Sequence, residues 1–111
     1  MEFVQYVMEQ LRDIEEVTYR RMFGEYGLFC RGKFFAVICD NQLYVKITQE
    51  GRKILKGCME IPPYQGANPY FFIEDIDDAQ TLQRLVEATY RALLEPKPKT
   101  KRGKKNGKDR L

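Results

Sequence analysis

Short apolar runs separated by turn-forming residues fill the segment from Tyr19 to Ile47, and this alternation constrains the fold more than any other feature of the chain. Two tight turns are expected, at Arg31-Gly32 and at Asp40-Asn41, because Gly, Asp and Asn tolerate the positive φ that two-residue hairpin turns require. The three runs that these turns join are each of strand length: Tyr26–Cys30, Lys33–Cys39 and Gln42–Ile47. The segment therefore predicts an antiparallel meander.

A two-residue loop at Asp40-Asn41 also fixes which side chains share a face of the predicted sheet. The expected core face carries Phe34, Ala36, Ile38, Leu43, Val45 and Ile47, with Gly27 and Phe29 added from the preceding strand. The opposite face would then collect Tyr26, Leu28, Phe35, Val37, Cys39, Tyr44 and Lys46. This second face is also largely apolar, so it needs a cover: either helices of the same chain or a partner molecule.

Helical patterns flank the meander. Apolar residues recur at helical spacing within residues 2–15, and again from Leu82 to Leu93 after a predicted capping box at Asp77–Gln80. Thr48 is the expected N-cap of a short helical turn, and Tyr70–Ile73 reads as a further strand after a Pro- and Gly-containing loop at residues 58–69. The predicted class is α+β, in the order N-terminal helix, antiparallel β-meander, short helix, further strand and C-terminal helix.

Charge divides the chain into two parts. Of the 19 Lys and Arg and 16 Asp and Glu residues, residues 96–111 contain eight and one, leaving 11 against 15, a net charge of −4, in residues 1–95. At 111 residues the chain is expected to form one domain, residues 1–95, followed by a disordered basic tail, residues 96–111. The tail cations are Lys97, Lys99, Lys101, Arg102, Lys104, Lys105, Lys108 and Arg110.

The residue types argue against most catalytic chemistry. The sequence contains no histidine, no phosphate-binding glycine motif, and three scattered cysteines without metal-ligand spacing. A nucleophilic thiol at Cys58 remains imaginable, since Arg52 and Lys56 would lower its pKa. We therefore expect no enzyme activity, no catalytic residues, no cofactor, no metal and no small-molecule substrate.

The cysteine pattern and the lack of a long apolar run bear on location. An odd number of cysteines and no segment with the character of a signal peptide or membrane span predict a reduced, cytoplasmic protein that does not bind membranes. The cysteines are then expected to pack as small apolar residues.

Several pieces of the central segment resemble the N-terminal domain of the TfoX/Sxy competence regulators. The matching pieces, in order, are Arg21-Met22-Phe23-Gly24, Tyr26-Gly27-Leu28-Phe29, Gly32, Phe35-Ala36-Val37-Ile38 and Leu43-Tyr44-Val45-Lys46. The resemblance covers roughly residues 2–94 and implies a stand-alone copy of a domain of the secretion-chaperone-like kind. It further implies a bacterial regulatory role, linked to transcription of DNA-uptake genes, and it supplies no catalytic residues. One departure is Glu25, where the family often has a second glycine, and another is the basic tail in place of a second, helical domain.

Two sets of residues are candidates for partner contacts. The candidate contact face for a protein partner or a second copy comprises Tyr26, Tyr44 and Lys46, which could form an aromatic and cationic patch or could pack in the core. It also includes Arg20 and Arg21, which could hold a phosphate or a partner carboxylate or could lie on a solvated strand. The tail could bind DNA or RNA without reading sequence, by counterion release, or could be a solvated terminus. The sequence thus favours a protein-interaction module linked to competence regulation, with a nonspecific nucleic-acid-binding accessory protein as the alternative.

Overall fold

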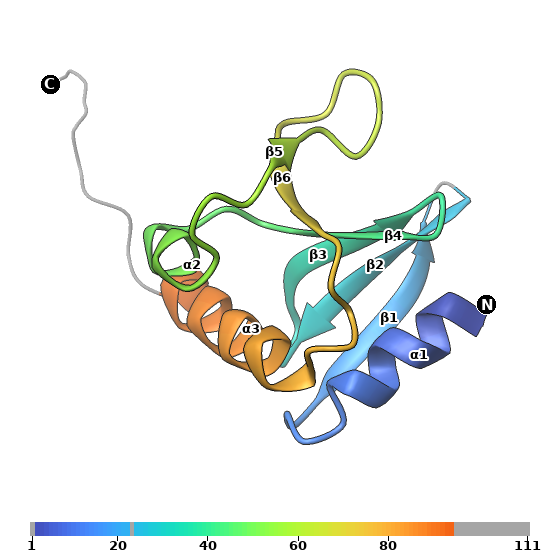
Figure 1. Ribbon diagram of the computed structural model, residues 1–111. Helices are drawn as coiled ribbons and strands as arrows, with labels where there is room; N and C mark the ends of the chain where they lie inside the picture. Colours follow the sequence, from blue (N-terminus) through green and yellow to red (C-terminus); the bar gives the residue numbers. More distant parts are fainter. Residues whose placement is uncertain (1, 23, 95–111) are drawn as a thin grey trace, which may run out of the picture.

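The fold, seen in a computed structural model that describes residues 2–22 and 24–94, is an antiparallel sheet packed against three helices (Figure 1). The helices are α1 (Glu2–Gln10), α2 (Gln49–Ile54) and α3 (Ala79–Leu94). The strands are β1 (Val17–Met22), β2 (Glu25–Cys30), β3 (Lys33–Cys39), β4 (Gln42–Val45), β5 (Glu60–Ile61) and β6 (Tyr70–Ile73). The strand order across the sheet is β1-β2-β3-β4-β6-β5, with every neighbouring pair antiparallel. This arrangement confirms the predicted α+β class.

Both predicted hairpin turns are present. Arg31 and Gly32 have φ values of 49° and 83°, and Asp40 and Asn41 have values of 56° and 57°. Two successive residues with positive φ are the signature of the tight turn whose twist suits a hairpin. The strands β3 and β6 have the bounds that the sequence predicts, whereas the two-residue strand β5 lies inside the segment expected to be only a loop.

A β-bulge between β2 and β3 overturns part of the predicted register. Next to the turn, Phe29 pairs with Phe34 as expected, but the register shifts and Leu28 pairs with Ala36, so that Phe35 is the additional residue. Every β2 side chain, on either side of the bulge, therefore points to the face opposite to the predicted one, and so does that of Phe34. Leu28 and Phe35 are completely buried. The predictions that Gly27, Phe29 and Phe34 lie on the core face, and that Tyr26, Leu28 and Phe35 lie on the other, are wrong.

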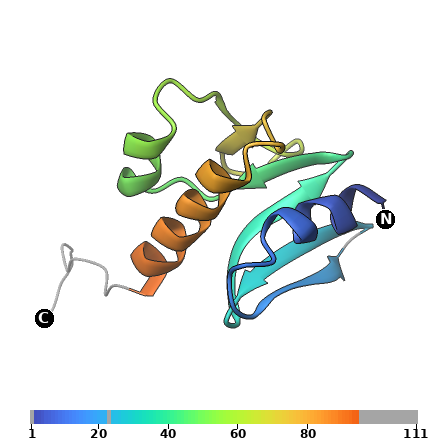
Figure 2. The ribbon, with the colours of Figure 1, turned by 60° about the horizontal axis from the view of Figure 1, so that its bottom comes forward.

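Helices α1 and α3 lie over one face of the sheet, which we call the covered face, and α2 packs beside α3 on the same side (Figures 1 and 2). Helix α1 contributes Val4 and Val7 to the core, and α3 contributes Leu82, Leu85 and Val86. The strand side chains in the same cluster are Leu28, Cys30, Phe35, Ala36, Ile38, Leu43, Val45, Phe71 and Ile73. The hydrophobic core thus lies entirely between the helices and the covered face.

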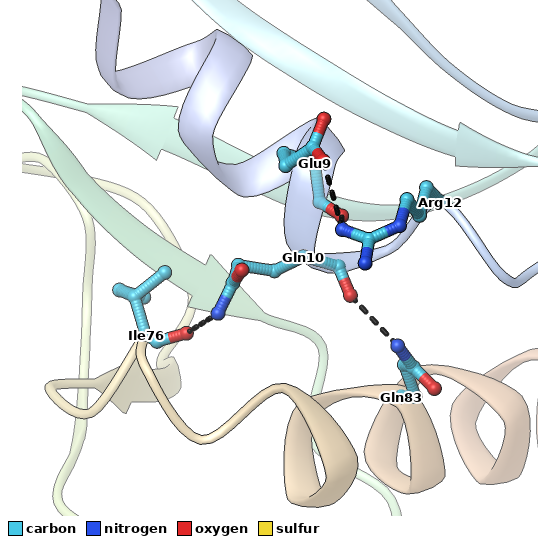
Figure 3. A network of polar contacts seen from close by, with 5 residues as sticks. All are labelled: Glu9, Gln10, Arg12, Ile76 and Gln83. Carbon is cyan, nitrogen blue, oxygen red and sulfur yellow. Dashed lines mark hydrogen bonds and ion pairs between the residues drawn. The ribbon is translucent and has the colours of Figure 1, made fainter.

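Polar contacts tie the end of α1 to the region that opens α3 (Figure 3). The side chain of Gln10 donates a hydrogen bond of 2.8 Å to the carbonyl of Ile76, and the side chain of Gln83 donates one of 2.9 Å to the carbonyl of Gln10. The nearby Arg12 pairs with Glu9 at 2.8 Å. The contacts of Gln10 and Gln83 satisfy polar groups at the partly buried end of a helix, where the last carbonyls have no partner within the helix.

The cap of α3 lies one residue later than predicted. Asp78, not Asp77, accepts a hydrogen bond from the backbone N–H of Thr81, at 3.2 Å. Asp77 instead accepts a hydrogen bond from the hydroxyl of Tyr6 in α1. The predicted capping box at Asp77–Gln80 is therefore wrong in register, because a tertiary contact with α1 engages the first of the two adjacent aspartates.

Candidate functional site

The face of the sheet opposite the helices, which we call the open face, is the candidate functional surface. In the ranges 2–22 and 24–94, no helix lies over it (Figure 2). Its position follows from the pairing register, in which residues directly opposite each other share a face. It carries Arg20, Met22, Glu25, Gly27, Phe29, Phe34, Val37, Cys39, Tyr44, Lys46, Tyr70 and Phe72.

Aromatic rings on the open face contact one another in pairs. The centroids of Phe29 and Phe34 are 5.5 Å apart, and those of Tyr44 and Phe72 are also 5.5 Å apart. These spacings are within the range of favourable aromatic contact. Tyr44 is only 8% exposed, and burial raises the pKa of its hydroxyl. The open face is therefore a packed apolar layer rather than a set of separate exposed side chains.

Two cations lie over this aromatic layer. The guanidinium carbon of Arg20 is 5.6 Å from the centroid of Phe29, and Nζ of Lys46 is 4.9 Å from the centroid of Phe34. Both distances permit cation–π attraction, which holds a long side chain against a ring while its N–H donors face outward. The face thus offers apolar area with positive charge beside it.

A hollow of about 500 Å³ opens on the same side of the sheet. Its lining consists of Met22, Glu25, Tyr26, Gly27, Phe34, Val37, Cys39, Tyr64 and Tyr70. Gly27 keeps its floor low, because a Cβ there would lie 2.6 Å from Sδ of Met22 and 3.1 Å from Cε1 of Phe34. The hollow is mostly apolar and has one carboxylate, that of Glu25, which accepts a hydrogen bond from the backbone N–H of Asp40 at 3.2 Å.

The five residues predicted to form one contact patch lie on two faces. Arg20, Tyr44 and Lys46 are on the open face, whereas Tyr26 pairs with Ile38 and Arg21 pairs with Tyr26, on the covered face. The guanidinium carbon of Arg21 is 5.8 Å from the ring of Tyr26. The bulge at Phe35 explains why Tyr26 lies on the covered face, whereas Arg20 and Arg21 face opposite sides in any register because they are consecutive in one strand.

The aromatic pair of Phe29 and Phe34 is the part of the site that sequence reasoning assigned to the wrong face. The doublet Phe34-Phe35 carried a usable signal, because two adjacent residues of a regular strand cannot both face the core. A bulge resolves that conflict here by burying Phe35 and leaving Phe34 on the open face. Nothing in the composition of the doublet indicates which of the two phenylalanines is buried.

The thiols lack the environment of reactive cysteines. Burial raises the pKa of Cys30, Cys39 and Cys58, and all three are free. The sulfur of Cys58 lies 3.3 Å from the carbonyl of Phe72, and Arg52 binds Glu60 at 2.9 Å. The cations near Cys58 in the sequence therefore do not lower its pKa, contrary to the expectation for a nucleophilic thiol.

Within the described ranges there is no group of three or more His, Cys, Asp or Glu residues placed to hold a metal ion. No described helix is long and apolar enough to cross a membrane. The predicted nucleic-acid tail, Lys97, Lys99, Lys101, Arg102, Lys104, Lys105, Lys108 and Arg110, lies outside the described residues, as does the predicted domain boundary at residue 95.

Comparison with known proteins identifies the family to which this chain belongs. A protein from Spirochaeta aurantia, described as an uncharacterized 12.7 kDa protein in the trpE 5′ region, is 33% identical over 106 residues, which are 95% of this chain and 92% of that protein. The family described as the TfoX N-terminal domain matches residues 9–93, from the last two residues of α1 almost to the end of α3. The chain therefore belongs to the TfoX N-terminal domain family.

Proposed function

We propose that this TfoX-like protein is a regulatory module that works by binding another protein, and that it takes part in the transcriptional regulation of competence genes. The role proposed is binding rather than catalysis. The observation that supports it best is the one-sided packing of the helices, which leaves the open face with two aromatic pairs and a hollow of about 500 Å³. Apolar patches of this kind usually mark interaction surfaces.

The test compares two apolar-to-polar variants in a pull-down from a lysate of the source bacterium. Phe34→Ser removes a ring from the open face, and Leu94→Ser removes a 51%-exposed side chain at the end of α3, away from that face. We expect the wild-type chain and L94S to capture the same protein and F34S to lose it. Sedimentation of each purified protein at micromolar concentration separates a partner from a second copy. A strict monomer that captures nothing would count heavily against an interaction module.

The link to competence needs its own measurement, because binding alone does not establish it. Deleting the gene is expected to lower the transcripts of DNA-uptake genes and the frequency of natural transformation. Complementation by the wild-type chain and by L94S, but not by F34S, would connect the open face to that role. Unchanged transcripts after deletion would remove competence from the proposal while leaving the interaction module intact.

A second candidate function is nonspecific binding of DNA or RNA through residues 96–111. The supporting observation is their charge, eight Lys and Arg against one Asp. A labelled duplex titrated with the full chain, and with a variant in which these eight cations are replaced by Gln, tests it at two salt concentrations. Binding by the full chain alone that weakens by orders of magnitude as salt rises is the expected result for several neutralised phosphates. Equal binding by both proteins would assign the affinity elsewhere.

A further inference from the structure

The outer strand β1 leaves one long edge of the sheet open to another strand. It pairs with β2 over six residues, and in the described chain no strand pairs with its other side. Figure 2 shows β1 at the border of the sheet, with α1 over the covered face and not along the edge. The opposite edge, β5, is only two residues long. Since an edge strand presents unpaired N–H and C=O groups, β1 is the edge at which an extended segment can add.

Two arginines flank this edge, one on each face of the sheet. Arg20 and Arg21 are consecutive in an extended strand, so Arg20 lies on the open face and Arg21 on the covered face. Their guanidinium carbons lie 5.6 Å from Phe29 and 5.8 Å from Tyr26, rings that belong to the inner neighbour β2. Both arginines are exposed, and among the ion pairs of the described residues neither has a carboxylate partner. Each guanidinium group therefore contacts an aromatic ring of β2 on its inner side and can bind a carboxylate on its outer side.

The positive charge of the β1 edge favours some incoming strands over others. Centred antiparallel pairing with β1 of a second copy would bring the arginines of the two copies opposite or diagonal to each other, and like charges in those positions are destabilising. An incoming strand with two adjacent acidic residues is complementary instead. Directly opposed residues share a face, so one carboxylate would meet Arg20 on the open face and its neighbour would meet Arg21 on the covered face.

A second hollow lies beside the edge and suits the rest of such a strand. It has a volume of about 550 Å³ and is lined by Arg20, Arg21, Met22, Phe29 and Phe34. A residue two positions from the acid that faces Arg20 would project on the same side, toward this hollow. Its phenylalanine and methionine lining favours an apolar side chain there.

We propose that the β1 edge binds an extended acidic segment of a partner protein by strand addition, with two adjacent carboxylates on Arg20 and Arg21 and an apolar residue in the neighbouring hollow. This inference rests on the proposed function as a protein-binding module, and it names the chemistry of the partner. Phe34 lines the neighbouring hollow as well as the open face, so F34S is expected to affect both surfaces, whereas R20E/R21E keeps the aromatic rings and tests the edge.

The experiment uses a labelled peptide of alternating Thr and Val with a central Glu-Asp pair, and a matched peptide with Gln-Asn at the centre. Fluorescence anisotropy with the full chain is expected to show tighter binding of the Glu-Asp peptide. The double variant R20E/R21E should weaken that binding, by up to about fivefold for each arginine lost from a cross-strand ion pair. The same variant should gain affinity for a peptide with a central Lys-Lys pair. R84E, which reverses an exposed charge on α3, is the matched control and should change neither affinity.

Amide hydrogen exchange distinguishes strand addition from binding by charge attraction alone. Strand addition should slow exchange at the backbone amides of β1 that do not bond to β2, and leave the rates in β3 and β4 unchanged. Equal affinity for the Glu-Asp and Gln-Asn peptides, equal losses in R84E and R20E/R21E, or protection confined to β3 and β4 would each overturn the proposal. A protein captured by wild type and R20E/R21E but not by F34S would also overturn it, while supporting the proposed function through the open face. Failure of every variant and of wild type to capture a protein would refute the proposed function without affecting the peptide result.

Discussion

Gly51 shows how a single missing methyl group decides the fit between two elements. It lies in α2, and a Cβ at this position would be 2.6 Å from Cε2 of Phe71, 3.0 Å from Oγ1 of Thr48 and 3.2 Å from Cδ1 of Leu85. Phe71 and Leu85 are completely buried, so neither can move aside without disturbing the core. The hydroxyl of Thr48 is also engaged, because it caps α2 by accepting from the N–H of Gly51 at 2.9 Å. Close approach, not a positive φ, explains glycine here.

Gly51→Ala is therefore expected to destabilise the protein although alanine favours helix. The gain in helix propensity is about 1 kcal/mol. Overpacking against a ring that cannot yield costs about 1–3 kcal/mol, so the net effect should be a loss. The midpoint of urea unfolding measures it, and Gln49→Ala at an exposed neighbouring position is the control that should change the midpoint little, because Gln is already a good helix former. A higher midpoint for G51A than for wild type would show that Phe71 can move aside.

The cysteines give a second prediction at this scale. Because burial raises the pKa of Cys30, Cys39 and Cys58, the thiolate fraction of each is below that of an unstructured thiol at neutral pH. Alkylation by iodoacetamide should be slower than for glutathione at every site, and should reach Cys58 first because it is the most exposed of the three. The rate at Cys58 should rise as pH increases above neutrality. Labelling of Cys58 faster than glutathione at neutral pH would restore it as a candidate nucleophile.

At the scale of secondary-structure elements, the sequence predicts the turns and caps whose conformation depends only on the residues within them. The turns at Arg31-Gly32 and Asp40-Asn41 and the N-cap Thr48 were predictable because their residues determine the backbone conformation by themselves. The bulge at Phe35 was not predictable from the sequence. Which of the two adjacent phenylalanines is buried depends on packing against helices that are distant in the sequence. This one residue changes the face to which the β2 side chains point, and it places Tyr26 on the covered face, away from Tyr44 and Lys46.

The cap of α3 supplies a prediction at the same scale. Hydrogen bonding with the side chain of Thr81, and then with its backbone N–H, lowers the pKa of Asp78 below its usual value, so these contacts stabilise the fold above the pKa of the unfolded chain. That contribution should be lost as pH falls through the lower, folded-state pKa. Asp78→Asn keeps the acceptor oxygen but does not titrate, so its melting temperature should fall less than that of wild type between about pH 5 and pH 3. Asp77→Asn, which changes the neighbour that binds Tyr6, is the matched control. Identical acid profiles for wild type and D78N would contradict the assigned cap.

At the scale of the whole molecule, the helices divide the sheet into two surfaces with different tasks. The covered face supplies the core, and the open face and the β1 edge supply apolar area beside Arg20 and Lys46. The sequence indicated a two-sided apolar sheet but left open whether helices or a partner covers the second side. In the described part of the chain, α1 precedes β1 and α2 and α3 follow β4, and these helices lie on the covered-face side of the sheet.

Removing residues 96–111 is expected to change the net charge of the protein without changing its stability. Among the described residues, every member of the hydrophobic core cluster lies between Val4 and Val86, whereas residues 96–111 carry eight of the 19 Lys and Arg residues. A chain ending at Glu95 should therefore unfold at the same urea midpoint as the full chain, yet change from a net charge of +3 to −4 and lose retention on a heparin column. Unfolding curves and salt elution of the two chains measure both properties. A lower midpoint for the shortened chain would mean that the last residues pack on the globule, and unchanged retention would place the anion-binding surface on the sheet, where R20E/R21E is the variant that tests it.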